Sequence, residues 1–421
     1  MRNARLWVAM LGLTQTIVER VEFDEDRDIL VAHVRPVRSA RGRCGRCERR
    51  SPGYDLGAGR RRWRALDLGT VQVVVEGRAP RVTCRDHGVT VARVPWARHD
   101  AGHTYAFDDT VAWLAVQCSR TAVQQVMRVA WRTVGAIVAR VSADALRRVD
   151  VLDGLTRIGI DEISYKRGQR YITVVVNHDT RRLVWASVGR DRANLHAFFD
   201  ALGERCAQIA FVSSDSADWI EEVVRARIPG AVHCADPFHV VQWAQTALDE
   251  VRRASWNTAR GALNKRRGGR AYGGTANQLV KARHALWKNP ARLSSHQQAQ
   301  IAWIAKTDPT LHRAYLLKEG LRHVFELDGD LAKEALNRWP SWARRARLPS
   351  FRKVITRVVK YRAQIDATLE HRLTNGLIES TNTKIRLLTR LAFGFHDPHA
   401  LIGLAMLSLA GICPPLPGRI A

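Results

Sequence analysis

Two carboxylates follow apolar runs that are typical of buried strands. Asp161 comes directly after IGI, and Asp215 closes the run IAFVSSD. In an open α/β sheet the carboxyl ends of neighbouring strands face one crevice, so the two acids can become neighbours in space. Side chains alternate faces along a strand. Glu162 should therefore point away from Asp161 into a structural role, and only one of the two can be a ligand.

Carboxylates gathered at one sheet edge suit hard cations. Mg²⁺ or Mn²⁺ takes oxygen ligands, and two such ions ~3.5–4 Å apart can hold the attacking and the leaving oxygen of a phosphoryl displacement. A third acid, Glu379, lies in the first turn of a helix predicted within NGLIESTNTKIRLLTRLAFGF. It shares a helix face with Asn382, Thr383 and Arg386. An acid in a first helical turn also complements the helix dipole without any further function.

A D-x-x-H step, Asp236 and His239, follows the fifth predicted strand and begins the next helix. Asp236 is the alternative to Asp215 as the second metal ligand. A histidine three residues after an aspartate is also an ordinary capping arrangement at a helix start. We therefore expect a supporting role for the pair, with simple capping as the alternative.

Two short hooks in the N-terminal region, CGRC at 44–47 and CRDH at 84–87, have the spacing of metal ligands. Three thiolates and one imidazole make a closed tetrahedral zinc site, and a small β-rich module needs such a staple. His99 or His103 can replace the fourth ligand, and unbound thiols are the simpler alternative. The predicted ligands of one structural Zn²⁺ are Cys44, Cys47, Cys84 and His87.

The elements that must position these residues change along the chain. Short β-like runs between Gly- and Arg-rich turns fill residues 1–105, and a helical period follows at 106–150. Residues 151–245 then read as three strands followed by βαβ alternation, which predicts a mixed sheet covered by helices. Residues 246–369 read as helices, and 370–421 contain the helix of Glu379.

Charge indicates a polyanionic partner. The chain carries 67 Lys and Arg against 40 Asp and Glu, a formal net charge of +27, and nucleic acid is the usual partner of so basic a protein. Between Val251 and Thr307 there are twelve Lys or Arg and no acid. An ordinary basic helix surface is the alternative to a DNA contact. The residues predicted to contact phosphates there are Lys265, Arg266, Arg267 and Arg270.

The segment SRTAVQQVMRVAWRTVGAIVARV, residues 119–141, has the pattern of a helix-turn-helix. The apolar stripe of the second helix is Val134, Ile137, Val138 and Val141. Arg132, Thr133 and Arg140 remain available to a DNA groove. A plain helical hairpin between domains is the alternative.

Other protein classes fit poorly. No stretch approaches ~20 consecutive apolar residues, and the first residues lack the features of a secretory signal. Seven cysteines spread over 421 residues indicate reduced thiols rather than a disulfide framework. We expect a cytoplasmic, nucleoid-associated protein with no membrane partner.

Four blocks together carry a family resemblance: GIDEISYKRG, SSDSADWI, ADPFHVV and NGLIESTNTKIRLLTRLAFGF. In this order they resemble the signature blocks of the ISL3 family of bacterial insertion-sequence transposases, and the likeness extends to the N-terminal cysteine pairs. Ser216 departs from the hydrophobic residue that commonly follows the second aspartate. The resemblance implies a ribonuclease-H-like core with an Asp-Asp-Glu triad at Asp161, Asp215 and Glu379, and an N-terminal zinc module.

The resemblance thus implies a multidomain α/β protein. Its parts are a zinc-binding β-rich module (1–105), a helix-turn-helix (106–150), a catalytic core of mixed sheet (151–245 and 370–421) and an all-α insertion (246–369). A C/D-x-x-H element near the active site of related transposases corresponds to Asp236 and His239. Lys384 and Arg386, on the helix of Glu379, are further expected DNA contacts.

The expected function is a transposase that binds the inverted ends of its element and cuts and joins double-stranded DNA. Bringing two ends together requires a dimer or larger assembly. Two rivals are a non-catalytic DNA-binding regulator descended from such an enzyme and a structure-selective nuclease that does not join DNA. The presence of all three acids favours the enzyme over the regulator.

Overall fold

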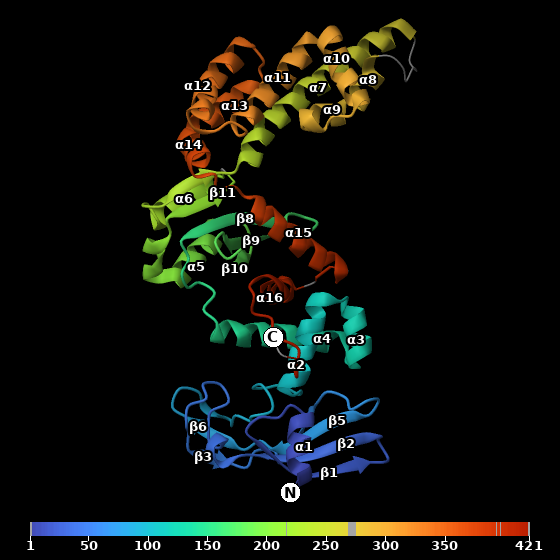
Figure 1. Cartoon of the computed structure of the whole chain (residues 1–421), viewed down its shortest axis with the longest axis vertical. Coiled ribbons are helices and arrows are strands. Elements are labelled where there is room, and N and C mark those ends of the chain that lie inside the picture. Colours follow the sequence, from blue (N-terminus) through green and yellow to red (C-terminus); the bar gives the residue numbers. More distant parts are fainter. Residues whose placement is uncertain (1, 216, 268–274, 393, 396, 420–421) are drawn as a thin grey trace. The chain divides into compact units, whose positions relative to one another are not determined.

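The computed structural model describes residues 2–215, 217–267, 275–392, 394–395 and 397–419. The chain forms two compact units (Figure 1). The first contains Met1–Val151 together with Lys384–Ala421, and the second is Leu152–Thr383. The finer division into five parts made from the sequence remains a prediction.

The N-terminal module of the first unit has two small sheets. The larger has the order β1-β2-β5-β4, in which only β2 and β5 pair in parallel. The smaller has the order β3-β6-β7, all antiparallel. Trp63 and Trp96 pack edge to face in the core of the larger sheet, with ring centroids 5.4 Å apart. The elements are α1 (Arg2–Met10), β1 (Thr16–Asp24), β2 (Ile29–Pro36), β3 (Gly53–Asp55), β4 (Arg60–Arg64), β5 (Gln72–Arg78), β6 (Arg81–Cys84) and β7 (Gly88–Val91), with a 3₁₀ turn at Arg38–Ala40.

Four helices complete the first unit: α2 (Tyr105–Gln117), α3 (Arg120–Met127), α4 (Trp131–Arg148) and α16 (Pro398–Leu409). The Ser119 hydroxyl caps α3 by accepting a hydrogen bond from the amide of Ala122. The helix ends at Arg128, whose φ of +52° turns the chain toward α4. The predicted apolar stripe of α4 is buried, from Val134 to Val141.

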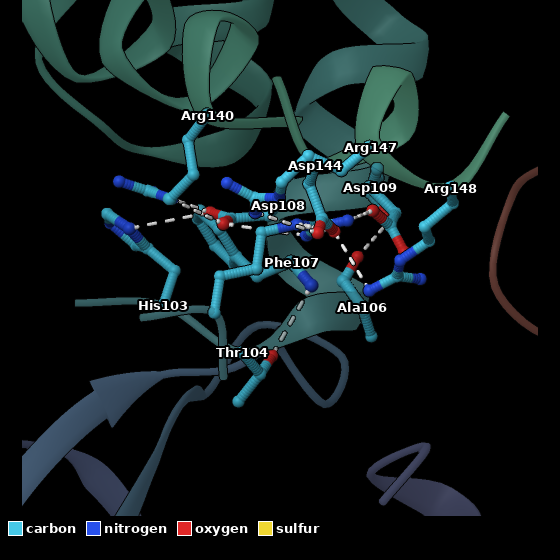
Figure 2. A network of polar contacts seen from close by, with 12 residues as sticks. His103, Thr104, Ala106, Phe107, Asp108, Asp109, Arg140, Asp144, Arg147 and Arg148 are labelled. Carbon is cyan, nitrogen blue, oxygen red and sulfur yellow. Dashed lines mark hydrogen bonds and ion pairs between the residues drawn. The ribbon is translucent and has the colours of Figure 1, made fainter. Parts of the chain in front are cut away.

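A buried ion network joins α2 to α4 (Figure 2). Asp108 on α2 is fully buried and accepts two hydrogen bonds from Arg140, at 2.9 and 3.0 Å. Arg98, with 8% of its side chain exposed, pairs with Asp109 at 2.6 Å and with Asp144 of α4 at 2.9 Å. Buried charges are stable only when they are paired, so each partner depends on the others.

Asp108→Asn is expected to lower the free energy of opening of α2 and α4 by about 3 kcal/mol, because the Arg140 guanidinium loses the buried carboxylate that balances its charge. Amide hydrogen exchange of the two helices measures this loss. Asp100→Asn is the matched control, since the Asp100 side chain is 72% exposed. Equal protection in the two variants would contradict the prediction.

The second unit is built on a five-stranded mixed sheet with the order β10-β9-β8-β11-β12. Strands β8, β11 and β12 run parallel, and β9 and β10 are antiparallel to their neighbours. The bounds are β8 (Arg157–Lys166), β9 (Arg170–Asn177), β10 (Arg182–Val188), β11 (Phe211–Ser214) and β12 (Val232–Ala235).

Helices cover both faces of this sheet. On one face Ile158 and Ile160 of β8 share a core with Phe198 of α5 (Arg192–Leu202) and with residues of α6 (Asp218–Arg227). A 3₁₀ turn, Gly203–Gln208, follows α5. On the other face Gly159 lies against Ile378 of α15 (Gly376–Leu391), so closely that a Cβ atom would come within 2.4 Å of Ile378. Asp161 shares this second face with Gly159.

The segment between β12 and α15 is helical throughout its described part, as the sequence predicts. It has a core of its own, which includes Leu248, Leu317 and Phe351. Thr368 ties it to the sheet by donating a hydrogen bond of 2.7 Å to the carbonyl of Ala235. The helices are α7 (Pro237–Arg267), α8 (Thr275–Lys281), α9 (Arg283–Trp287), α10 (Ser295–Thr307), α11 (Pro309–Val324), α12 (Gly329–Arg345), α13 (Phe351–Lys360) and α14 (Arg362–His371), with a 3₁₀ turn at Pro290–Arg292.

Within the described residues, no helix combines the length and the apolar character that crossing a membrane would require.

Candidate active site and zinc centre

Three aspartates lie side by side at the carboxyl edge of the second unit's sheet. Ile160 of β8 pairs with Ser214 of β11, and Ser214 pairs with Ala235 of β12. The residue after each of these is an aspartate. The acids are therefore in register on neighbouring parallel strands. Ligands of open α/β sheets bind in the crevice outside the carboxyl ends of such strands. They are Asp161, Asp215 and Asp236.

Asp161 is held by α15. The Asn382 amide donates a 2.8 Å hydrogen bond to one carboxylate oxygen, and the Glu162 backbone N–H donates to the other at 2.7 Å. Burial raises the pKa of Asp161 to about 6, and the neighbouring charge of Asp215 adds to the rise. The sequence placed Asn382 on the face of Glu379 but gave no hint that Asn382 would hold Asp161.

Asp215 has an unsatisfied acceptor. Its Oδ1 is buried and accepts no hydrogen bond from the residues that the structure describes. Burial raises the pKa of Asp215, and the charge of Asp236 adds to the rise, whereas His239 and Arg190 oppose it. A buried carboxylate oxygen without a partner is costly unless a cation or a donor arrives. The local donor set is oxygen-rich and acidic, which fits Mg²⁺ or Mn²⁺.

Asp236 is almost fully buried, and its oxygens already have partners within the chain. One oxygen lies 2.8 Å from Nδ1 of His239, and the other accepts from the Asn375 backbone N–H at 3.4 Å. Burial works against the charge on His239, but the bond to Asp236 and the charges of Asp215 and Asp161 raise its pKa overall. This favours the supporting role over metal ligation.

Glu379 lies in the first turn of α15 and is exposed. Its backbone N–H bonds the Asn375 carbonyl at 2.9 Å, and it stands three residues before Asn382. Among the described residues, no three acids or histidines at this edge bring ligand atoms within 4.8 Å of one another. The structure thus places Asp161 and Asp215 on neighbouring strands, and Glu379 at an exposed position of the helix that holds Asp161.

Glu162 points to the other face of the sheet, as strand alternation predicts, but it is not remote from the acids. It pairs with Arg190 at 2.7 Å, and only 8% of its side chain is exposed. Burial raises its pKa to about 7, with Asp215 the next contributor. Its second oxygen is buried without a hydrogen bond. Sequence reasoning gave no sign of the pairing with Arg190, since nothing local links the two residues.

The zinc hooks converge in the N-terminal module. Their four ligand atoms all lie within 4.8 Å of one another. Cys47 Sγ is 3.6 Å from Cys84 Sγ, and His87 Nδ1 is 3.5 Å from Cys84 Sγ and 3.8 Å from Cys44 Sγ. Tetrahedral zinc with Zn–S bonds of ~2.3 Å requires sulfur–sulfur distances of about 3.8 Å. The cluster has the dimensions of a zinc site.

His87 is therefore the fourth member of the cluster. The alternatives have other partners: His99 pairs with Asp100 at 3.3 Å, and His103 lies 3.7 Å from Asp108. The hydrogen bond from His87 lowers the pKa of Cys84 to about 6, which favours the thiolate that zinc requires.

The residues predicted to contact DNA fall into three groups. At the start of α4, Arg132 is exposed and Thr133 is half-buried. On α15, Lys384 and Arg386 are exposed. The Arg140 guanidinium pairs with the buried Asp108 carboxylate, which gives it a structural role, and its contact with a DNA groove stays a prediction. Lys265, Arg266 and Arg267 belong to the last turns of α7, but their side chains lie outside the described part, and Arg270 lies outside the described residues.

Comparison with known proteins identifies the domains. Residues 158–404 match the transposase domain model of the ISL3 family. Residues 92–142 match the helix-turn-helix domain of transposase family ISL3. Residues 40–87 match the zinc finger of the transposases of IS204, IS1001, IS1096 and IS1165. These matches confirm the helix-turn-helix and the N-terminal zinc module that the sequence leads us to expect.

Curated relatives match the chain over all or nearly all of its length. The transposase for insertion sequence element IS1557 of Mycobacterium tuberculosis is 59% identical over 100% of this chain and 98% of its own length. The transposase for IS1001 of Bordetella parapertussis is 27% identical over 94% of this chain and 96% of its own. A chain of the Drosophila P element transposase strand transfer complex aligns with 73% of this chain and 93% of its own at 11% identity, with a TM-score of 0.37. By its sequence and its domain content, this chain belongs to the ISL3 family of transposases.

Proposed function

We propose that the chain binds the terminal inverted repeats of its own element and catalyses DNA cleavage and strand transfer at a site for divalent cations. The observation that carries the proposal is the in-register row of aspartates at the sheet edge, with one buried oxygen of Asp215 left without a partner. The mixed five-stranded sheet, interrupted by a helical insertion before α15, supports a ribonuclease-H-like core.

Asp161, Asp215 and Glu379 are the proposed ligands of two Mg²⁺ or Mn²⁺ ions. The ions would supply charge stabilisation to the attacking and leaving oxygens of an in-line displacement. Asn382 fixes the orientation of Asp161 through its 2.8 Å bond. Glu379 stands one turn before Asn382 on the same helix, so the contact that anchors α15 to Asp161 also carries Glu379 to the site.

His239 is the proposed contact to the scissile phosphate. Asp236 occupies Nδ1, so Nε2 of a protonated ring remains to donate to a phosphate oxygen. The acids around it raise the pKa of His239, which favours the protonated form. Water is the nucleophile in the cleavage step, and the freed 3′-OH is the nucleophile in the joining step.

The DNA contacts are divided among the domains. Arg132 and Thr133 face the groove from α4, and the zinc module contributes to end binding. Two groups of basic residues neutralise phosphates without reading sequence. They are Lys384 and Arg386 on α15, and Lys265, Arg266, Arg267 and Arg270 in the acid-free stretch. A dimer or larger assembly brings the two ends together. The proposed domain limits are those expected from the sequence.

An assay with pre-cleaved ends tests the catalytic assignment. Oligonucleotides that carry the inverted repeats flanking the gene are incubated with protein and Mg²⁺ or Mn²⁺, and joining to target DNA is measured. Glu379→Gln should abolish joining while end binding is kept, because one charged oxygen ligand is lost. Glu162→Gln is the control and should keep substantial activity, since a carboxyl with a pKa of about 7 is already partly neutral.

The outcomes separate the rivals. Robust joining by Glu379→Gln would show that the third ligand is misassigned and that this acid only complements the helix dipole. Cleavage of intact ends by the wild-type protein without any joining of pre-cleaved ends would identify a nuclease. End binding without either reaction would identify a regulator.

A further inference from the structure

An open hollow of about 720 Å³ lies at the β8–β9 hairpin and the end of β10, farther along the strand that carries Asp161. Its wall includes two half-buried tyrosines, Tyr165 and Tyr171, and two exposed arginines, Arg170 and Arg190. No acidic residue lines it. Neither the metal site nor the proposed duplex contacts use these side chains.

The hollow is preformed by the backbone. The Gly189 amide donates a 2.9 Å hydrogen bond to the Tyr171 carbonyl, and the Thr173 hydroxyl donates to the Gly189 carbonyl at 2.9 Å. These bonds fix the end of β10 against β9. The Arg190 guanidinium lies 5.1 Å from the centre of the Tyr171 ring, which orders both side chains. A ligand therefore meets a surface that is already organised.

The chemistry of this wall selects its occupant. Aromatic rings beside arginines are the means by which proteins bind single-stranded nucleic acid: bases stack on the rings and the cations neutralise phosphates. A base inside a duplex already has both faces covered by its neighbours, so only an unpaired base can use the tyrosines. The charged residues of the lining are Arg170 and Arg190, and no acidic side chain stands in the lining to repel phosphate.

The position of the hollow fixes which nucleotides reach it. Arg190 pairs on its other side with Glu162, the residue after Asp161. Tyr165 is four residues beyond Asp161 on the same strand, about 13 Å at ~3.3 Å per residue. We propose that the hollow binds unpaired nucleotides of the DNA strand within a few positions of the scissile phosphate. This inference rests on the proposed function, which places the scissile phosphate at the aspartates.

Binding measurements without added divalent ions test the inference on the full-length protein. The probes are a duplex of about 25 base pairs and the same duplex with an unpaired tail of about five thymidines. The wild-type protein should bind the tailed probe more tightly. Tyr165→Ala should weaken binding of the tailed probe roughly 5- to 100-fold, the range of single base–aromatic stacks, and leave the blunt probe unchanged. Tyr165→Phe keeps a stacking ring and should restore the preference.

Tyr54→Ala is the matched control. Tyr54 also lies under an arginine, with Arg81 5.1 Å from its ring centre, but belongs to the first unit. It should affect both probes alike. Bromodeoxyuridine in the tail, cross-linked by light, should attach to Tyr165 or Tyr171. Arg170→Glu, at an exposed position, gives a second test that does not depend on removing a ring.

Three results would overturn the inference: equal binding of the two probes by the wild-type protein, loss of both probes in Tyr165→Ala and Arg170→Glu, or cross-links only outside the hollow. The outcome is separable from that of the proposed function. If the protein prefers the tailed probe through the hollow but shows no strand transfer, only the proposed transposition chemistry is refuted. If it shows strand transfer but no preference for the tailed probe, only the proposed role of the hollow is refuted.

Discussion

Asp161→Asn and Asp215→Asn are each expected to abolish cleavage and joining and, in the absence of divalent ions, to make the second unit more stable rather than less. The two carboxylates lie side by side with raised pKa values, because burial penalises their charged forms. Asparagine keeps the shape and removes the charge. The Oδ1 of Asn382 is buried without a partner, so its amide can turn over and accept a bond from the introduced amide.

The direction of the pH dependence follows from the raised pKa of Asp161. This pKa rises from 3.8 to about 6 on folding. The folded state therefore binds the proton more tightly than the unfolded state does, and stability falls as pH rises from near 4 through about 6. Above that window the full penalty applies, about 1–3 kcal/mol at ~1.4 kcal/mol per pKa unit. Bound Mg²⁺ should remove it.

Thermal unfolding of the second unit at pH 5 and pH 8, with and without Mg²⁺, measures these effects. The wild-type protein should gain stability from Mg²⁺ at pH 8 and little at pH 5, and the variants should gain little at either. Asp153→Asn, at an exposed acid of the same unit, should change neither activity nor stability. A wild-type protein that gains no stability from Mg²⁺ at pH 8, together with variants that are less stable than it at that pH without Mg²⁺, would contradict the metal assignment.

The activity losses should not add. The two acids are expected to hold the same pair of ions, so the double variant should lose little more than either single variant. A much larger loss in the double variant would show that the acids act separately.

The double variant Cys44→Ser with Cys47→Ser is expected to lose zinc and unfold the smaller sheet of the N-terminal module. Zinc binding to such sites contributes ~10–16 kcal/mol that is also folding energy. The sheet has strands of only three or four residues, and β3 is exposed throughout, so its own core cannot replace the metal. Binding to the element ends should weaken with it.

Metal analysis and amide hydrogen exchange of β3, β6 and β7 measure the two losses together. The wild-type protein should hold about one zinc in the cluster of three thiols and one imidazole. Cys118→Ser is the matched control, because this half-buried cysteine lies outside the cluster. Full zinc content in the double variant would show that the cluster is not the metal site.

The residues that could be read from the sequence are those fixed by local rules. An acid after an apolar strand points to a sheet edge, and paired hooks point to zinc; the structure places Asp161, Asp215 and the four-residue cluster accordingly. Strand alternation also placed Glu162 on the face opposite Asp161.

The remainder depends on partners that are distant in sequence. Arg140 has the helical position of a groove contact, but Asp108 of another helix takes up its charge. Nothing local reveals that Asn382 bonds Asp161, 221 positions away. The same applies to Arg190, whose pairing with Glu162 connects the acids to the tyrosine-lined hollow.

The hydrogen bond between Asp236 and the Asn375 amide closes a loop of 139 positions. The helical segment therefore leaves the sheet and returns to it at nearly the same point. Loop-closure entropy grows only with the logarithm of loop length, and a doubling costs ~0.6 kcal/mol. The length of the insertion can therefore change widely in evolution at little thermodynamic cost. Its consequence for folding concerns α15, which carries Asn382 and Glu379 and follows the insertion in the chain: docking of α15 on the sheet is the step that closes this loop, and we expect the three aspartate-bearing strands to pair before it.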